Sequence, residues 1–307
     1  MLKIPYEKII DENYIGKEIN PIDSQNIFKL AFEYSKEINY ENGNINLLII
    51  DAQRDFIDIE KGALPVKGAI EDIKRIIRFI YNNIESISDI YITLDTHKYD
   101  SIFHSIMWKD KNNNLIKPFT EITFDKIKNN EIMPIYNEDI QIEYIKSLEK
   151  QGSKNLIIWP YHCIYGTDGW LIEKQLSNML LFFEVYRKKH INKILKGEYS
   201  FSEMYGVLRP EVINDNAKNY DISWIYNLKS SDKIYICGEA KDFCVYESVK
   251  QLCDVYDSNV ANTIHVMMNC CSTIGDEYEC NNKYKLLSNK YGIKLINVWI
   301  ITFINWQ

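Results

Sequence analysis

Short apolar runs rich in β-branched residues alternate with segments of helical spacing through most of this chain. In one such segment Val245, Val249 and Leu252 would share a helix face. This alternation predicts an α/β domain in which helices cover both faces of a mostly parallel sheet, with functional side chains beyond the carboxyl ends of the strands. The expected strands cover 46–50, 90–94, 156–158, 191–195, 234–237, 264–268 and 293–298, and the expected helices cover 69–84, 170–189, 245–253 and 278–290.

Two stretches do not fit the alternation. Residues 1–44 form an N-terminal arm with one expected helix at 24–38, and the polar, Asn- and Lys-rich stretch at about 109–150 is an insertion. No Gly-, Ser- or Pro-rich linker divides the rest, so we expect a single domain over 45–307. The sequence contains neither GxGxxG nor GxxxxGK[ST], which argues against a dinucleotide or P-loop site.

Composition limits the partners and the compartment. The chain has 307 residues, a formal net charge of −7 and 7 cysteines. The negative charge disfavours nucleic acid and anionic membrane as partners and favours a small molecule or a protein. An odd set of thiols without a CxxC pair predicts reduced cysteines in a cytoplasmic protein, and no stretch has the character of a secretory signal or a membrane span.

Polar residues follow several of the expected strands. Asp51 ends one apolar run, where it could serve a site or merely cap the next helix. Asp95 ends another and is followed by His97 and His104, while His162 follows a third run. Asp-x-His offers an oxygen and an imidazole from one extended stretch, which suits zinc, iron or manganese. A single histidine is more often a hydrogen-bonded structural residue, as we expect for His190 and His265, but the concentration of such residues at three strand ends favours a site.

Cys244 and Lys196 are two further candidates. Cys244 is expected in the first turn of a helix that follows a strand and a Gly-containing turn, where backbone N–H groups and the helix dipole favour a thiolate and could also receive an oxyanion. The alternative is a buried, inert thiol, which is what we expect of the other six cysteines. Lys196 ends an expected strand beside Gly197, although most lysines are simply solvated.

The order of these motifs resembles the isochorismatase-like cysteine hydrolases, and the nicotinamidase branch in particular. IIDAQRDF resembles the opening D-x-Q-x-D-F of that branch, and GALPV the loop after it. DTH resembles its metal-binding D-x-H, WPYHC its W-P-x-H-C, and YICGEAKDFCV its nucleophile turn. The resemblance covers about residues 45–300 discontinuously, and WPYHC together with GEAKDFC is its most specific part.

The resemblance implies a three-layer αβα fold with a mostly parallel six-stranded sheet of Rossmann-like topology. It implies Asp51, Lys196 and Cys244 as a catalytic triad, with a cis peptide at Glu239-Ala240 and an oxyanion hole formed by the amides of Ala240 and Cys244. It also implies a divalent metal ion, with zinc first and iron or manganese as alternatives. The implied metal ligands are Asp95, His97 and His162, with His104 as a candidate fourth, and the implied aromatic walls of the substrate site are Phe56 and Trp159.

The expected activity is therefore hydrolysis of a small, planar carboxamide to a carboxylate and ammonia through a thioester. The alternatives are an isochorismatase-type hydrolase, another small amide or ureide hydrolase, or a noncatalytic scaffold that retains the fold. His104 lies seven residues after His97, one more than in the nicotinamidase pattern, and the turn before Cys244 carries more charged residues than usual. We expect a small-molecule amide as the partner, no nucleic acid, no membrane, and association into a homo-oligomer.

Overall fold

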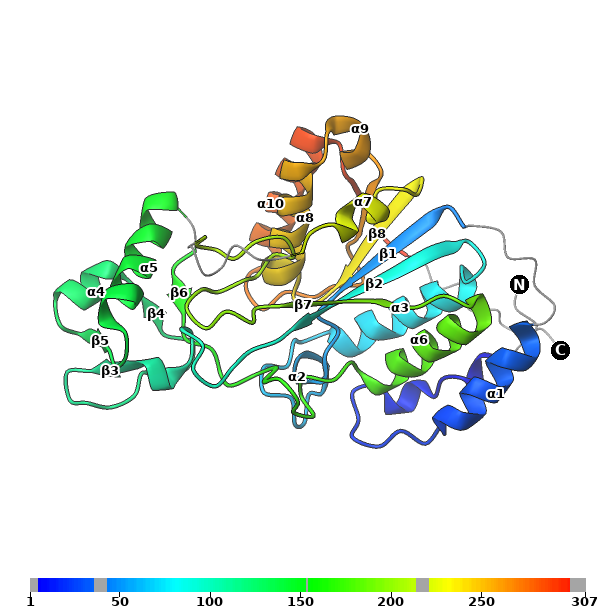
Figure 1. The fold of residues 1–307 in the computed structure, drawn as a ribbon, viewed down its shortest axis with the longest axis horizontal. Coiled ribbons are helices and arrows are strands. Elements are labelled where there is room, and N and C mark those ends of the chain that lie inside the picture. Colours follow the sequence, from blue (N-terminus) through cyan, green and yellow to red (C-terminus); the bar gives the residue numbers. More distant parts are fainter. Residues whose placement is uncertain (1–4, 36–42, 153, 214–220, 299–307) are drawn as a thin grey trace.

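A six-stranded parallel sheet forms the centre of the molecule (Figure 1). The computed structural model describes residues 5–35, 43–152, 154–213 and 221–298. The strand order is β10-β9-β8-β1-β2-β7. The strands are β1 (Ile45–Ile50), β2 (Ile87–Asp95), β7 (Asn192–Lys196), β8 (Lys233–Gly238), β9 (Ile264–Met267) and β10 (Lys294–Ile296). This architecture confirms the predicted α/β fold.

The burial of the strands explains the apolar runs in the sequence. Every residue of β1 is buried, as expected of a central strand that helices cover on both faces. By contrast β7, at one edge of the sheet, exposes most of its residues and buries Lys196 at its end. The chain leaves β1 toward β2 on one side, while β8 pairs with β1 on the other. The switch point of the topology therefore lies between β1 and β8, where α/β proteins place their ligands.

Helices cover the two faces of the sheet (Figure 1). On one side α3 (Ala69–Asn82) packs beside α6 (Lys174–Arg187), and on the other α8 (Tyr246–Val255) contacts α10 (Glu277–Tyr291). The short helices are α2 (Arg54–Ile57), α7 (Trp224–Leu228) and α9 (Ser258–Ala261). Helix α6 starts at Lys174 rather than at the predicted residue 170, because the side chain of Glu173 accepts a hydrogen bond from the Leu176 amide, at 2.8 Å, and caps the helix.

The arm and the insertion have structures of their own. Helix α1 (Ser24–Ser35) packs on the outer side of α6, and the predicted continuation to residue 38 lies outside the described residues. The insertion contains α4 (Phe124–Lys128), α5 (Glu138–Gln151) and the strand pair of β3 (Trp108–Asp110) with β5 (Ile132–Pro134). It also contains β4 (Glu121–Ile122), which pairs with β6 (Leu156–Ile157) just after the insertion. These elements form a lobe at one end of the molecule (Figure 1).

The expected strand at 156–158 is not part of the central sheet. Leu156 and Ile157 form β6, which pairs antiparallel with β4 of the insertion. A run this short carries no signal for its partner, and its backbone pairs instead with Glu121 and Ile122 of the insertion.

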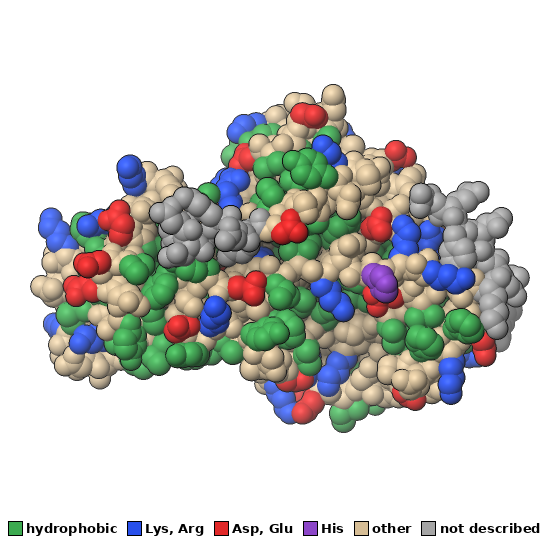
Figure 2. Space-filling model, viewed as in Figure 1, with side chains coloured by type: hydrophobic (Ala, Val, Ile, Leu, Met, Phe, Trp, Pro, Cys, Tyr) green, Lys and Arg blue, Asp and Glu red, His purple; other side chains and the backbone are tan. Residues whose placement is uncertain are grey.

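The surface carries charge of both signs. Figure 2 shows acidic and basic side chains scattered over one face without a continuous field of either sign. None of the helices in the described ranges is both long and apolar enough to cross a membrane.

Candidate active site

The ends of four neighbouring strands bring the main sequence candidates together. Asp51 follows β1, Asp95 and Lys196 are the last residues of β2 and β7, and Cys244 lies in a helical turn after β8. Asp95 and Lys196 are register partners in the β2–β7 pair. Because parallel strands end at the same edge of a sheet, residues far apart in sequence converge there.

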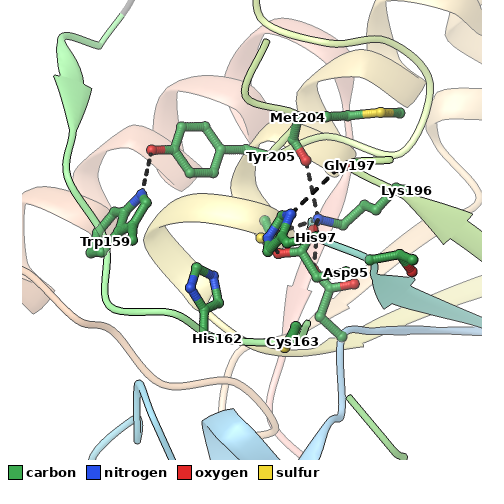
Figure 3. A network of polar contacts seen from close by, with 12 residues as sticks. Asp95, His97, Trp159, His162, Cys163, Lys196, Gly197, Met204 and Tyr205 are labelled. Carbon is green, nitrogen blue, oxygen red and sulfur yellow. Dashed lines mark hydrogen bonds and ion pairs between the residues drawn. The ribbon is translucent and has the colours of Figure 1, made fainter. Parts of the chain in front are cut away.

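Lys196 lies at the centre of this cluster (Figure 3). Its Nζ atom is 2.8 Å from Asp51 Oδ2, 3.0 Å from Asp95 Oδ1 and 3.5 Å from Cys244 Sγ. It also donates a hydrogen bond to the Met204 carbonyl at 3.1 Å. Lys196 and Asp51 are fully buried, so the ammonium group is surrounded by acceptors and excluded from solvent.

The charges of the cluster follow from these contacts. Burial works to lower the pKa of Lys196, but the carboxylates of Asp51 and Asp95 outweigh it and raise that pKa well above its ordinary value. Burial raises the pKa of the Asp51 carboxyl, against the opposing charge of Lys196. Burial also raises the pKa of the Cys244 thiol well above its ordinary value, again against Lys196. The resting thiol therefore keeps its proton, contrary to the thiolate that the helix position favoured in the sequence.

Asp51 is held in place by its neighbours on the next strand. Its backbone has a φ of 43°, in the left-handed region that is uncommon for residues with a side chain. The Thr93 hydroxyl accepts a hydrogen bond from the Asp51 amide at 3.0 Å and donates one to Asp51 Oδ1 at 2.6 Å. This leaves Oδ2 directed toward Lys196 and within the same small group of atoms as Cys244 Sγ. Asp51 does not act as a helix cap.

A second group, beside the first, has the composition of a metal site. Ligand atoms of Asp95, His97 and His162 all lie within 4.8 Å of one another, and all three residues are buried. His97 Nε2 is buried without a hydrogen bond from any described residue, although it is 3.1 Å from Asp95 Oδ2. His162 uses Nδ1 on the Pro160 carbonyl at 2.8 Å, which orients its other nitrogen. One oxygen and two imidazoles in this arrangement fit a divalent ion such as zinc.

His104 does not belong to this group of three. Its ring centre lies 6.4 Å from that of His97 and 6.5 Å from that of His162. Its Nδ1 is 3.2 Å from the Tyr99 carbonyl, and burial lowers its pKa to about 4. The structure therefore places His104 beside the group, packed against Tyr161 and Phe103.

A small cavity opens between these two groups and the turn at Ala240. Its volume of about 20 Å³ holds roughly one water molecule, so a larger ligand requires the lining to move. Phe56 and Trp159, the walls expected from the resemblance, both line it together with Cys244 and Ala240. The remaining lining residues are Leu64, Asp95, His162, Glu203, Tyr205, Phe243 and Ile274.

Glu203 and Tyr205 are lining residues that the sequence did not reveal. Trp159 Nε1 donates a hydrogen bond to the Tyr205 hydroxyl at 3.2 Å (Figure 3). Glu203 is buried, and burial raises the pKa of its carboxyl to about 7. Both follow Lys196 in a loop without periodicity, so only their closeness to Lys196 in the chain could have indicated them.

The turn before Cys244 has the conformation that the resemblance implied. The Glu239-Ala240 peptide bond is cis. A single helical turn, Lys241–Val245, follows it and continues directly into α8, so Cys244 does lie at the start of a helix. The other six cysteines are buried and free.

Comparisons with known proteins agree with this geometry at the level of the fold. No family model matches the chain, and no curated protein does. Among solved structures, the yeast nicotinamidase matches with a TM-score of 0.58 and 20% identity, over 83% of this chain and 100% of that one. The chain has the nicotinamidase fold. An Acinetobacter baumanii nicotinamidase/pyrazinamidase matches with a TM-score of 0.55 and 18% identity over 84% of this chain and 97% of its own.

A third structure with the nicotinamidase fold comes from L. infantum and was solved in complex with nicotinate. It matches with a TM-score of 0.51 and 17% identity, over 85% of this chain and 96% of that chain. Each match covers nearly the whole length of the other protein but only 83–85% of this chain. The rest of this chain has no counterpart in these structures.

Proposed function

We propose that the protein is a cysteine-dependent amidohydrolase of the nicotinamidase type, which converts a small carboxamide to a carboxylate and ammonia. The observation that carries this proposal is the placement of Cys244 Sγ 3.5 Å from Lys196 Nζ, with Asp51 bound to the same ammonium group. A nucleophile that lines the cavity, with a base and a cation grouped around its sulfur, supplies the parts that acyl transfer from an amide requires.

The first half of the reaction forms a thioester. Asp51 takes the proton from the Cys244 thiol, and Lys196 stabilises the thiolate as it forms. The sulfur attacks the amide carbon, and the backbone amides of Ala240 and Cys244 stabilise the oxyanion of the tetrahedral intermediate. Asp51 then returns the proton to the leaving nitrogen, and ammonia departs. Burial raises the pKa of Asp51, which favours its taking up the thiol proton, while the charge of Lys196 opposes the raised pKa of Cys244 and so favours the thiolate as it forms.

The second half releases the product. A water molecule takes the place of ammonia and gives a proton to Asp51 as its oxygen attacks the thioester carbon. The tetrahedral intermediate collapses, the carbon–sulfur bond breaks, and Asp51 returns the proton to the sulfur. The products are a carboxylic acid, which loses its remaining proton to solvent at neutral pH to give the carboxylate, and the resting thiol, so the enzyme is regenerated without a redox step.

Asp95, His97 and His162 would hold the metal ion, with zinc proposed first and iron or manganese as alternatives. When bound, the ion supplies a Lewis acid that orients a polar group of the substrate or polarises a water molecule. Phe56 and Trp159 would contact the two sides of a planar substrate, and nicotinamide and pyrazinamide are the first compounds to test. A cytoplasmic location and association into a homo-oligomer remain predictions from the sequence.

The decisive experiment measures ammonia release from a panel of small amides and ureides by the zinc-loaded protein and its Cys244→Ala variant. We expect hydrolysis of at least one carboxamide, reduced by more than about a thousandfold in the variant. Cys253→Ala is the matched control, because Cys253 is a buried thiol on α8 outside the cavity, and it should retain activity. An active Cys244→Ala protein would exclude the mechanism, and no turnover of any compound would favour a noncatalytic scaffold.

A further inference from the structure

Two carboxyl groups lie together behind the turn that carries Ala240, outside the cavity. Glu239 immediately precedes Ala240, and Asp72 projects from α3. Both are buried, and their side chains are close enough to share a hydrogen bond. Glu239 Oε1 is completely enclosed and receives no hydrogen bond from a donor in the described part of the chain. A buried carboxylate oxygen without a donor is costly, so this oxygen calls for an explanation.

Ser272 connects the two carboxyl groups to the backbone of the turn. Its amide donates to Glu239 Oε2 at 3.1 Å, and its hydroxyl donates to Asp72 Oδ2 at 2.5 Å. Its carbonyl accepts a hydrogen bond from the Lys241 amide at 2.8 Å. A single residue therefore contacts both carboxyl groups and the backbone on the far side of Ala240.

The backbone of Glu239 reaches the other half of the candidate active site. Its amide donates to the Ile50 carbonyl at 2.9 Å, and Ile50 is the residue before Asp51. A displacement of Glu239 would consequently move the end of β1, which carries the proposed base Asp51, and the turn that leads to Cys244.

The groups around Glu239 leave it short of positive charge. Asp72 faces it from α3, where Arg75 is paired with Asp72. The other neighbouring groups are Lys241 from the turn after Ala240, Cys237 from β8, and Cys270, Cys271 and Ser272 from the segment after β9. Arg75 lies 3.4 Å from Asp72 Oδ1, and Lys241 Nζ lies 3.5 Å from Glu277. Arg75 therefore compensates the charge of Asp72, and neither cation forms an ion pair with Glu239 in the described part of the chain.

Burial raises the pKa of both carboxyl groups, and that of Glu239 lies well above its ordinary value because the charge of Asp72 adds to the effect of burial. Two buried carboxylates in contact cannot both ionise without strong repulsion.

We propose that Glu239 is a positioning residue that keeps its proton at neutral pH and donates it from Oε1 to Asp72, and that this hydrogen bond holds the turn bearing Ala240 and Cys244. Asp72 carries the single negative charge of the pair and also accepts from Ser272. Loss of the proton at higher pH leaves two carboxylates in contact and displaces the turn. The consequence for catalysis rests on the function proposed above, whereas the protonation is a property of the fold alone.

The protonation is tested by urea unfolding of the unmodified protein and its Glu239→Gln variant. Glutamine reproduces both the donor and the acceptor but cannot ionise. In this pH range Glu239 is ionised in the unfolded chain and protonated in the folded one, so the unmodified protein takes up one proton on folding and the variant takes up none. The unfolding constant of the unmodified protein, divided by that of the variant, should therefore rise about tenfold per pH unit between about pH 5.5 and about pH 7.5. Glu121→Gln removes an exposed carboxylate on β4, in the insertion, and should leave the pH slope unchanged. Equal slopes for the unmodified and Glu239→Gln proteins would overturn the proposal.

The positioning role is tested by kcat and KM for nicotinamide as a function of pH. We expect Glu239→Gln to retain kcat at neutral pH and to remain active at higher pH than the unmodified protein. Glu239→Ala should lower kcat by about tenfold or more with a smaller change in KM, because the oxyanion donors lose their alignment. Unchanged kcat in Glu239→Ala would overturn the positioning role. If no form of the protein hydrolyses nicotinamide, the unfolding slopes still decide the protonation, and only the proposed substrate fails.

Discussion

Asp95 Oδ1 lies 3.0 Å from Lys196 Nζ, and these two residues are also register partners across β2 and β7. The other oxygen of the same carboxylate lies 3.1 Å from His97 Nε2. Burial works to raise the pKa of Asp95, but His97 and Lys196 outweigh it and hold that pKa below its ordinary value. The Asp95 carboxylate therefore belongs both to the cluster around Cys244 and to the candidate metal group. Loss of a charge in one group should therefore shift the pKa values of the other.

Replacing Lys196 by methionine should strongly destabilise the protein. The substitution keeps most of the volume but leaves Asp51 and Asp95 buried without their shared cation, which costs about 3–5 kcal/mol of unfolding free energy by analogy with other broken buried ion pairs. Lys193→Met, at an exposed position of the same strand, should change stability by less than about 0.5 kcal/mol. Urea unfolding at neutral pH measures both. Equal stability of the two variants would contradict the ion-pair network.

Zinc should stabilise the protein through His162 and not through His104. A ligand that binds only the folded state raises the unfolding free energy by about 2.7 kcal/mol when its free concentration is about 100 times Kd. We expect the unmodified protein and His104→Ala to show this rise in thermal unfolding, and His162→Ala to lose it together with zinc retention in equilibrium dialysis. Loss of the zinc effect in His104→Ala would mean that four residues hold the ion.

Removing the Tyr205 hydroxyl should destabilise the lining of the cavity. Tyr205→Phe leaves the buried indole N–H of Trp159 without its acceptor, at a cost of about 1–3 kcal/mol. Tyr226→Phe is the comparison, because Tyr226 is 64% exposed and should tolerate the change. Chemical unfolding of the two variants side by side gives the difference, and no loss in Tyr205→Phe would show that water replaces the hydroxyl.

The carboxyl group of Glu211 should make stability depend on pH. Burial, reinforced by the charge of Glu247, raises its pKa to about 7, and its Oε1 lacks a hydrogen-bond donor among the described residues. A raised pKa contributes stability that is complete below the ordinary carboxyl pKa and is lost as pH rises through about 7. Glu211→Gln should therefore match the unmodified protein near pH 4.5 and exceed its unfolding free energy by up to about 3 kcal/mol near pH 8.

The matched control for Glu211 is Glu121→Gln, at an exposed position of β4. This variant should follow the unmodified protein at every pH in the same unfolding series. A Glu211→Gln protein that does the same would mean that water reaches the carboxyl group.

The parts of the site that lie at strand ends could be predicted from the sequence, since an apolar run that ends in Asp51 or Asp95 specifies both the strand and the edge at which it terminates. The partner of Leu156 could not, because pairing with Ile122 depends on the folded insertion. The protonation state of Cys244 could not be predicted from the neighbouring sequence either. The helix start is visible in the sequence, but the burial and the two carboxylates that raise the thiol pKa come from distant strands.

The charge state of Glu239 also could not be predicted from the sequence. The sequence shows an extra charged residue in the turn, but Asp72 and Ser272, which determine whether that residue carries charge, come from α3 and from the segment after β9. Glu203 and Tyr205 lie in a loop whose side chains follow neither the strand nor the helix period, so the pattern contains no information about which of them faces inward.

Lys196 lies in the last register pair of an edge strand, so the placement of its ammonium group is largely independent of the residues that line the cavity. A shift of one residue in this pairing would turn the ammonium group to the opposite face, so the placement of the cation depends on strand pairing and not on the length of the loop that follows. The loop after Gly197 contributes the Met204 carbonyl to this ammonium group, but the strand pairing and the two carboxylates already fix the position of the cation. Changes at other positions of this loop would therefore alter the lining of the cavity while the proposed catalytic groups Asp51, Lys196 and Cys244 stay in place.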